Sequence, residues 1–348
     1  MPRAERSPSG SAAASAGATA SPPRAQLRVP DAPTSRDATQ SQRVNPVIAT
    51  EPWTLLGREG RMLTTPHYRV FSTVEDARLE SRTPRFLEFA LQHYTSGLAP
   101  LPMPTAPMDT YVLGTRPQWQ AITRRIAGRN AATYLRIQRG GYAFSGRGVY
   151  WDIGPSDTLS LAAHEGWHQF TQSTFRNPLP SWLEEGIACY MEGFRWHPVM
   201  ADTPNFLPWA NTERFDILRR AVAAKRTLPL DELMSTRVAD LVNSSGDGTL
   251  IYYGQAWALV HFLVEGENGR FRDAFAALLQ DAASGTMYGN LATRLGDGPA
   301  RSAALRRRGP EVFLAYFDDD LESMNASFEA FMARIVRTGG RDAVVAGR

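Results

Sequence analysis

Residues 159–170 read LSLAAHEGWHQF and place His164 and His168 four positions apart in an apolar segment. On an α-helix, residues four apart lie on the same face, one turn above each other. Glu165 is the only charged residue of the segment. This pattern predicts a buried helix that carries a few polar groups inward, with the two imidazoles side by side.

Two imidazoles in this arrangement can bind one Zn²⁺ at about 2.0–2.1 Å each. Glu165 follows His164 directly, the position at which HExxH zinc peptidases carry the carboxylate that accepts a proton from water. The alternative is a purely structural helix. Gly166 in the middle of that helix also costs about 1 kcal/mol relative to Ala.

A zinc site of this kind needs a third protein ligand and leaves one position for water. A further His six residues after His168 is excluded, because Thr174 stands there. A glutamate on a second helix is the other common solution. Residues 179–194, LPSWLEEGIACYMEGF, predict such a helix, which Pro180 opens, and supply the adjacent carboxylates Glu184 and Glu185.

The combination of HEGWH with WLEEGIACYME resembles the gluzincin branch of the MA-clan zinc peptidases. In the aminopeptidase N family, the glutamate before the glycine of W-L-x-E-G is a metal ligand, and it matches Glu185. The resemblance implies one Zn²⁺ per chain, bound by His164, His168 and Glu185, within a thermolysin-like zinc-peptidase core. An uncharacterised bacterial family of gluzincin-like domains shares, in addition, the segment YYGQAWALVHFL at 252–263.

The second helix has one stripe on which Trp182, Glu185, Cys189 and Glu192 lie together. Glu192 could therefore accept the free N–H of a zinc-bound histidine and fix its tautomer. The alternative for Glu192 is an exposed carboxylate near the helix end. We expect Glu184 to point to solvent and Cys189 to be a small buried hydrophobe.

Hydrolysis creates an oxyanion that needs a hydrogen-bond donor. In the aminopeptidases this donor is a tyrosine in the context Y-x-x-G-x-A-L, which matches Tyr253 and the residues after it, with Ala256 in place of the glycine. The resemblance thus implies a catalytic Tyr253, with Tyr252 as its competitor. Both could equally be core aromatics.

The chain departs from the aminopeptidases at the strand that binds the substrate's free amine. Their G-x-M-E-N motif has no counterpart, since 145–155 reads SGRGVYWDIGP and Asp152 is its only carboxylate. We therefore expect endopeptidase rather than aminopeptidase activity. A strand at this point can still pair with an extended peptide.

The predicted fold class is α+β, with a small mixed α/β lobe over residues 49–154 and a mainly helical lobe over 155–338. The first lobe should contain strands at 67–74, 109–115 and twice within 140–154, with helices at 81–98 and 117–128. Pro84 suits the first turn of the helix at 81–98. The second lobe should contain helices at 157–173, 180–194, 211–224, 249–265, 269–283 and 310–336.

Residues 1–48 are rich in Ala, Ser, Pro and Arg and predict a disordered tail, because such a stretch buries too little apolar surface to offset its ordering entropy. Residues 339–348 are expected to be a flexible C-terminus. The basic N-terminus is not followed by an apolar stretch and does not resemble a signal peptide. The compartment stays open, with an extracytoplasmic location as one alternative.

Charge and cysteine content limit the classes of partner. The net charge is +3 and the charges are scattered, with Arg306–Arg308 as the longest basic run. This short run is typical of a solvated face, and we expect no nucleic-acid partner. The single cysteine excludes an internal disulfide. The most apolar stretch, 250–264, is too short for a transmembrane segment.

These features together predict a zinc-dependent hydrolase, a metallopeptidase that cleaves peptide or protein substrates. The alternative is a non-catalytic, zinc-stabilised binding or cell-envelope scaffold module with a degenerate peptidase fold. The sequence leaves the substrate and the oligomeric state open.

Overall fold

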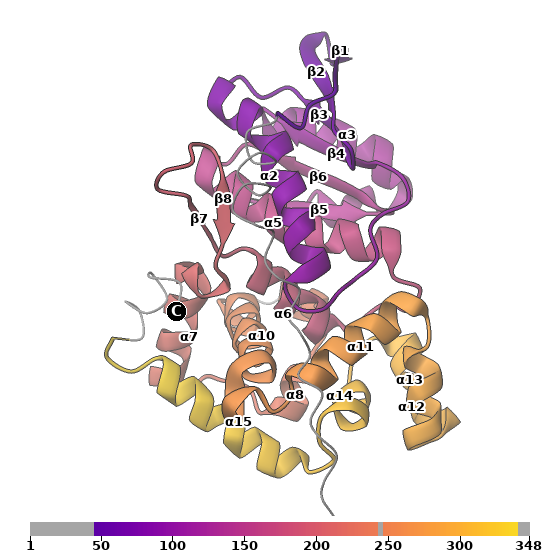
Figure 1. Cartoon of the computed structure of the whole chain (residues 1–348), viewed down its shortest axis with the longest axis vertical. Coiled ribbons are helices and arrows are strands. Elements are labelled where there is room, and N and C mark those ends of the chain that lie inside the picture. The colour runs from indigo at the N-terminus through magenta and orange to yellow at the C-terminus, as the bar shows by residue number, and fades with distance from the viewer. Residues whose placement is uncertain (1–44, 243–245, 340–348) are drawn as a thin grey trace, which may run out of the picture. The chain divides into compact units, whose positions relative to one another are not determined.

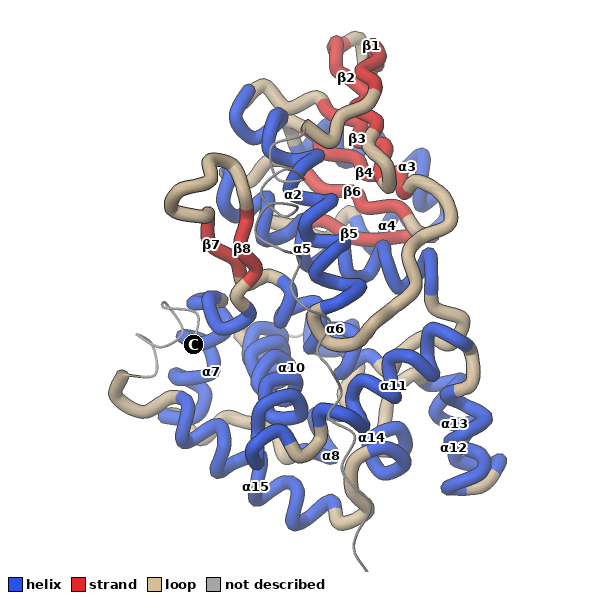
Figure 2. Tube along the Cα trace, in the orientation of Figure 1, coloured by secondary structure: helices blue, strands red, loops and turns tan. Residues whose placement is uncertain are grey.

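The computed structural model describes residues 45–242 and 246–339. The tail predicted over 1–48 and the C-terminus predicted over 339–348 lie almost wholly outside these residues. These described residues belong to one compact unit. The fold class is α+β, as predicted: a sheet with its covering helices comes first, and the part that follows is mainly helical (Figures 1 and 2).

The larger sheet has six strands in the order β1-β2-β3-β4-β6-β5. Their bounds are Ala49–Leu55, Arg58–Thr64, Tyr68–Ser72, Met108–Leu113, Gly141–Phe144 and Arg147–Trp151 for β1 to β6. The pairs β3–β4 and β4–β6 are parallel and the others antiparallel. Each parallel pair is joined by a crossover that contains a helix. Strand β5 is left at one edge of the sheet.

Helices cover both faces of the sheet. The helices α2 (Ala77–Ser96) and α5 (Pro155–Thr174) pack against each other and against strands on one face. The helix α3 (Arg116–Ala127) lies on the other face of the sheet. Every second side chain of a strand points to this face, and Trp119 of α3 packs among these side chains. The short helix α4 (Ala131–Tyr134) precedes β5.

The helical part is centred on α6 (Ser181–Met191) and α10 (Gly248–Glu265), which pack closely. Gly186 permits this approach, since a Cβ there would lie 2.6 Å from the carbonyl oxygen of Ala256. The helix α7 (Thr212–Ala223) packs on α10. The remaining strands and α-helices are β7 (Phe194–Trp196), β8 (Pro204–Phe206), α8 (Leu230–Ser235), α9 (Val238–Val242), α11 (Arg272–Ser284), α12 (Met287–Leu295), α13 (Asp297–Arg306), α14 (Glu311–Tyr316) and α15 (Leu321–Ile335).

Two sequence-based expectations about helix ends are wrong. Asp76 caps α2 by accepting the N–H groups of Arg78 and Leu79, so the helix begins earlier than predicted and Pro84 lies inside it, packed in the core. The helix predicted over 310–336 is two helices, α14 and α15. Asp320 caps the second by accepting the N–H of Ser323, which favours a new helix start over continuation.

The hairpins β1–β2 and β7–β8 and the helices α8, α9, α12 and α13 were not predicted. Strand β1 has an almost wholly exposed burial pattern, so it lacks the apolar alternation that identifies a strand in sequence. Among the described helices, none combines the length and apolar character needed to cross a membrane.

Candidate metal centre

Helix α5 carries both histidines on the face that meets α6. The Nε2 atoms of His164 and His168 lie 3.3 Å apart. Both rings are largely buried, with 11% and 13% of their side chains exposed. The four-residue spacing therefore brings the two imidazoles together, as the sequence predicts.

Gly166 lies between the two histidines because another side chain needs its space. The hydroxyl of Tyr94 on α2 donates a hydrogen bond to the carbonyl oxygen of Ala163 at 2.7 Å. A Cβ at position 166 would lie 2.6 Å from that hydroxyl oxygen. The glycine that weakens the helix locally thus lets α2 pack closely against α5 beside the two histidines.

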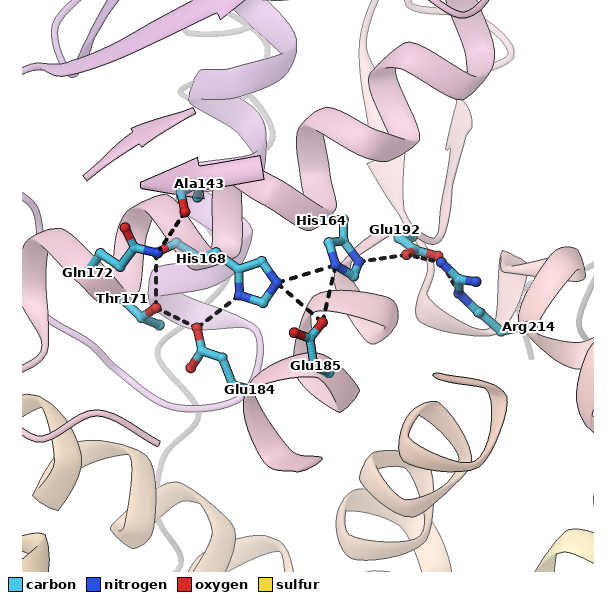
Figure 3. Close-up of polar contacts among 9 residues, drawn as sticks. All are labelled: Ala143, His164, His168, Thr171, Gln172, Glu184, Glu185, Glu192 and Arg214. Carbon is cyan, nitrogen blue, oxygen red and sulfur yellow. Dashed lines mark hydrogen bonds and ion pairs between the residues drawn. The ribbon is translucent and has the colours of Figure 1, made fainter. Parts of the chain in front are cut away.

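Glu185 on α6 completes a triangle of donor atoms (Figure 3). Its Oε2 atom lies 3.5 Å from Nε2 of His164 and 3.4 Å from Nε2 of His168. Three ligands held tetrahedrally at about 2.0–2.1 Å from one ion are separated by about 3.3–3.4 Å. The Oε2 atom is buried and has no hydrogen-bond partner among the described residues. Two imidazole nitrogens and a carboxylate oxygen are a donor set that suits Zn²⁺, so these residues fit the ion.

The electrostatics of the triangle favour a cation at its centre. Burial lowers the pKa of His168, but the carboxylates of Glu185 and Glu184 more than compensate and raise it to about 10. Burial raises the pKa of Glu185, but the two imidazoles hold it well below its usual range. Positive charge on this side of the rings is therefore stabilised, and a metal ion would take the place of the protons.

The outer nitrogen of each histidine is bound by a second carboxylate. Nδ1 of His164 lies 2.7 Å from Oε1 of Glu192, and Nδ1 of His168 lies 3.0 Å from Oε1 of Glu184. An acceptor at Nδ1 fixes the tautomer in which Nε2 presents its lone pair to a metal. Glu192 is therefore a buried partner of His164 and not an exposed carboxylate at the helix end.

The prediction that Glu184 points to solvent is wrong. Its residue exposure is only 8%. Besides His168, the hydroxyl of Thr171 donates to the same oxygen at 2.6 Å. The reason is that α6 crosses α5 with the His168 ring between two successive glutamates, so both can reach it (Figure 3).

Sequence reasoning also missed the residues that hold Glu192. Arg214 on α7 binds this carboxylate with two donors, Nη2 at 2.8 Å and Nε at 3.1 Å, and Asn211 donates to it at 2.5 Å. Burial raises the pKa of Glu192, but Arg214 and His164 outweigh it and lower the pKa to about 2. Cys189 is buried beside them, as predicted, and burial raises the pKa of its thiol. Because the oxygens of Glu192 are already bonded, its grouping with His164 and Cys189 makes a poor metal site.

A cleft of about 740 Å³ opens onto the triangle. Glu165 lines it next to the two histidines, and burial raises the pKa of this carboxyl. Tyr253 on α10 also lines it, with its ring 6.2 Å from that of His164. Tyr252 is fully buried in the core, and its hydroxyl has no partner among the described residues. Of the two competing tyrosines, only Tyr253 reaches the cleft.

The edge strand β5 forms one wall of the cleft, through residues 141–145. Asp152, beyond β6, does not line it. Its carboxylate accepts the N–H of Gly154 at 2.8 Å and the hydroxyl of Thr158 at 3.3 Å, in the turn before α5. Asp152 therefore helps to begin the histidine helix.

Comparison with known proteins adds one family. Residues 158–286 match the model of a family described as "Protein of unknown function (DUF1570)". The matched segment contains the triangle, Glu165, Glu192 and Tyr253, whereas the six-stranded sheet lies outside it. No curated protein matches the chain.

Proposed function

We propose that this protein is a zinc-dependent hydrolase, and specifically a metallopeptidase. The observation that carries the proposal is the triangle of donor atoms from His164, His168 and Glu185, with edges of 3.3 to 3.5 Å, at the floor of a cleft that Glu165 also lines. A structural zinc site is closed by four protein ligands, whereas a catalytic site has three and an open position. The three-donor set beside an open cleft favours catalysis.

His164, His168 and Glu185 would bind the metal. When bound, Zn²⁺ supplies Lewis acidity, which acidifies water and polarises a carbonyl oxygen. Glu165 accepts a proton from the attacking water at its carboxylate and then passes it to the leaving amine. Burial raises the pKa of Glu165, which makes its carboxylate a stronger base for the first of these two steps.

Tyr253 is the proposed hydrogen-bond donor to the oxyanion. Burial raises the pKa of its hydroxyl, which stays protonated and able to donate. The guanidinium of Arg214 lies 5.4 Å from the centre of its ring and positions it by a cation–π contact. Arg214 also binds Glu192, so one side chain links the proposed donor to the histidine face of the site.

The proposed substrate is an extended peptide that adds to the free edge of β5, beside the donor triangle. Endopeptidase activity is favoured over aminopeptidase activity. The only carboxylate of the strand segment before α5, Asp152, is engaged in a turn and is not free to bind a terminal amine.

The test compares wild type with Glu165→Gln after zinc loading, by mass-spectrometric analysis of a peptide library. We expect Glu165→Gln to keep its zinc and to lose cleavage by about 10²–10⁴-fold, the usual contribution of a positioned general base. Glu322→Gln, on the exposed first turn of α15, is the control and should cleave like wild type. Equal cleavage by wild type and Glu165→Gln would reject the mechanism. A zinc-loaded wild type that cleaves no peptide would favour the binding-module alternative.

A further inference from the structure

The basic run Arg306–Arg308 has one member at the cleft. Among the described residues that line the cleft, Arg307 is the only arginine or lysine. Its neighbours Arg306 and Arg308 are not among the lining residues. The sequence predicts a solvated face for the whole run. Arg307 is exposed, in agreement with this prediction, and it also lines the cleft.

Arg307 is held in place by its backbone and its side chain. It follows α13 with a left-handed φ of 51°, and its N–H donates to the carbonyl oxygen of Ala303. Its own carbonyl oxygen accepts the N–H of Ser181 at 2.7 Å. Its guanidinium donates through Nε and Nη2 to the carbonyl oxygen of Leu179, at 3.2 and 3.1 Å. These contacts fasten the end of α13 to the start of α6.

This attachment holds Arg307 near the N-terminal end of the helix that carries Glu185. Arg307 also lines the same cleft as His164, His168 and Glu185. One extended peptide bound in this cleft can therefore contact both the guanidinium and the donor triangle.

The guanidinium has unused binding capacity. Nη1 donates to none of the described residues, and no carboxylate in residues 45–242 or 246–339 forms an ion pair with Arg307. Three carboxylates share the cleft, those of Glu165, Glu184 and Glu185, and none of them forms an ion pair with Arg307. Glu184 and Glu185 contact His168 instead. A guanidinium that lines a cleft, is held by a carbonyl oxygen and keeps an unused donor is suited to bind a carboxylate.

We propose that Arg307 is a specificity-determining residue that binds a carboxylate of the peptide substrate. This inference rests on the proposed peptidase function and names the substrate class: peptides with an acidic group near the cleaved bond. The carboxylate can belong to an Asp or Glu side chain or to a nearby C-terminus. Both present the same planar pair of oxygens to the guanidinium.

The test uses zinc-loaded full-length protein with the Glu165→Gln change, which should bind peptides without cleaving them. The probes are fluorescent octapeptides in matched sets, with Glu or Gln at each position and with a free or amidated C-terminus. Binding is measured by fluorescence anisotropy. We expect a carboxylate at the right position to tighten binding roughly ten- to a hundredfold, as for a hydrogen bond between charged groups.

The variants assign this preference to one side chain. Arg307→Gln should abolish the difference between Glu and Gln peptides, whereas Arg306→Gln, a matched loss of charge in the same run, should retain it. Arg307→Lys should keep part of it, because it retains the charge without the planar fork. Zinc content and thermal unfolding show whether each variant is folded, and the lysine variant provides the test if Arg307→Gln does not fold.

A preference for carboxylate peptides that survives Arg307→Gln would overturn the inference, as would equal binding of acid and amide peptides or no binding at all. The proposed function fails separately. Wild type that cleaves peptides without regard to acidic groups would sustain the peptidase function and reject the role of Arg307. Arg307-dependent binding of acidic peptides, without cleavage by the zinc-loaded wild type, would sustain carboxylate binding by Arg307 and reject the peptidase function.

Discussion

Glu184 and Glu185 are neighbours in sequence and contact opposite nitrogens of one ring, His168. Oε1 of Glu184 lies 3.0 Å from Nδ1, and Oε2 of Glu185 lies 3.4 Å from Nε2. The two side chains therefore divide two tasks. Glu185 offers a metal ligand, and Glu184 orients the histidine that supplies another.

Glu184→Ala should weaken zinc affinity by about 10–100-fold, because His168 loses the acceptor that fixes its tautomer and orientation. Thr171→Val, which removes the other donor to the same oxygen, should have a smaller effect in the same direction. A competition titration against a zinc chelator measures both. Unchanged zinc affinity in Glu184→Ala would show that Glu184 does not orient His168 for metal binding.

Gly166→Ala should destabilise the protein through one specific contact, the hydroxyl of Tyr94 at 2.6 Å from the added Cβ. The expected cost is about 1–3 kcal/mol. In a Tyr94→Phe background the nearest remaining ring atom, Cζ, lies 3.4 Å away, so the same change should be close to neutral. Denaturant unfolding of both single variants and the double variant measures this coupling. Strictly additive effects would contradict this close packing of α2 against α5.

Arg214→Met should destabilise the protein by roughly 3–5 kcal/mol, since it leaves the buried carboxylate of Glu192 without its cationic partner. It should also weaken zinc binding through His164. Arg226→Gln, at the exposed pair with Asp247, is the control and should leave the melting temperature unchanged. If Arg214→Met melts like wild type, then Glu192 does not depend on this arginine.

His93 predicts a pH dependence that is independent of the metal centre. Its half-buried ring stacks on Phe206 at 5.0 Å, and burial lowers its pKa to about 4. Below about pH 6.5 the unfolded chain then binds more protons at His93 than the folded protein does. The free energy of unfolding is therefore unaffected by His93 above that pH and decreases as the pH falls towards 4. The loss is at most about 3 kcal/mol, and less where water reaches the ring.

His93→Phe keeps an aromatic ring against Phe206 and removes the titrating group. Urea unfolding of the metal-free protein between about pH 7 and pH 4 should show a shallower decline in stability for this variant than for wild type. Chelator in both samples removes the effect of metal release at low pH. Parallel profiles would show that His93 does not titrate differently in the folded protein.

The helices that bear the candidate site could be predicted because their signals are local. The spacing of His164 and His168 needs only a helical period, and the position of Glu185 follows from a motif that spans a few residues. Glu184 could not be placed in this way. Its orientation depends on how α6 crosses α5, which no period within one helix determines.

Arg214 and Arg307 depend on contacts that are distant in the chain. Arg214 reaches Glu192 from another helix, and Arg307 reaches Leu179 across a sequence separation of 128 residues. Neither stands in a sequence pattern that distinguishes it from the other arginines of the chain. The hairpin β1–β2 was missed for another reason: its side chains are largely exposed, so the apolar alternation that identifies a strand is absent.

Metal content tests the central claim most directly. Elemental mass spectrometry should be applied to purified wild type, His164→Ala, Glu185→Ala and Glu165→Gln after zinc reconstitution and removal of free metal. The account predicts about one zinc ion per chain in wild type and Glu165→Gln, and a marked loss in the other two variants. Wild type without tightly bound zinc, or with zinc that both ligand variants retain, would contradict the proposed centre.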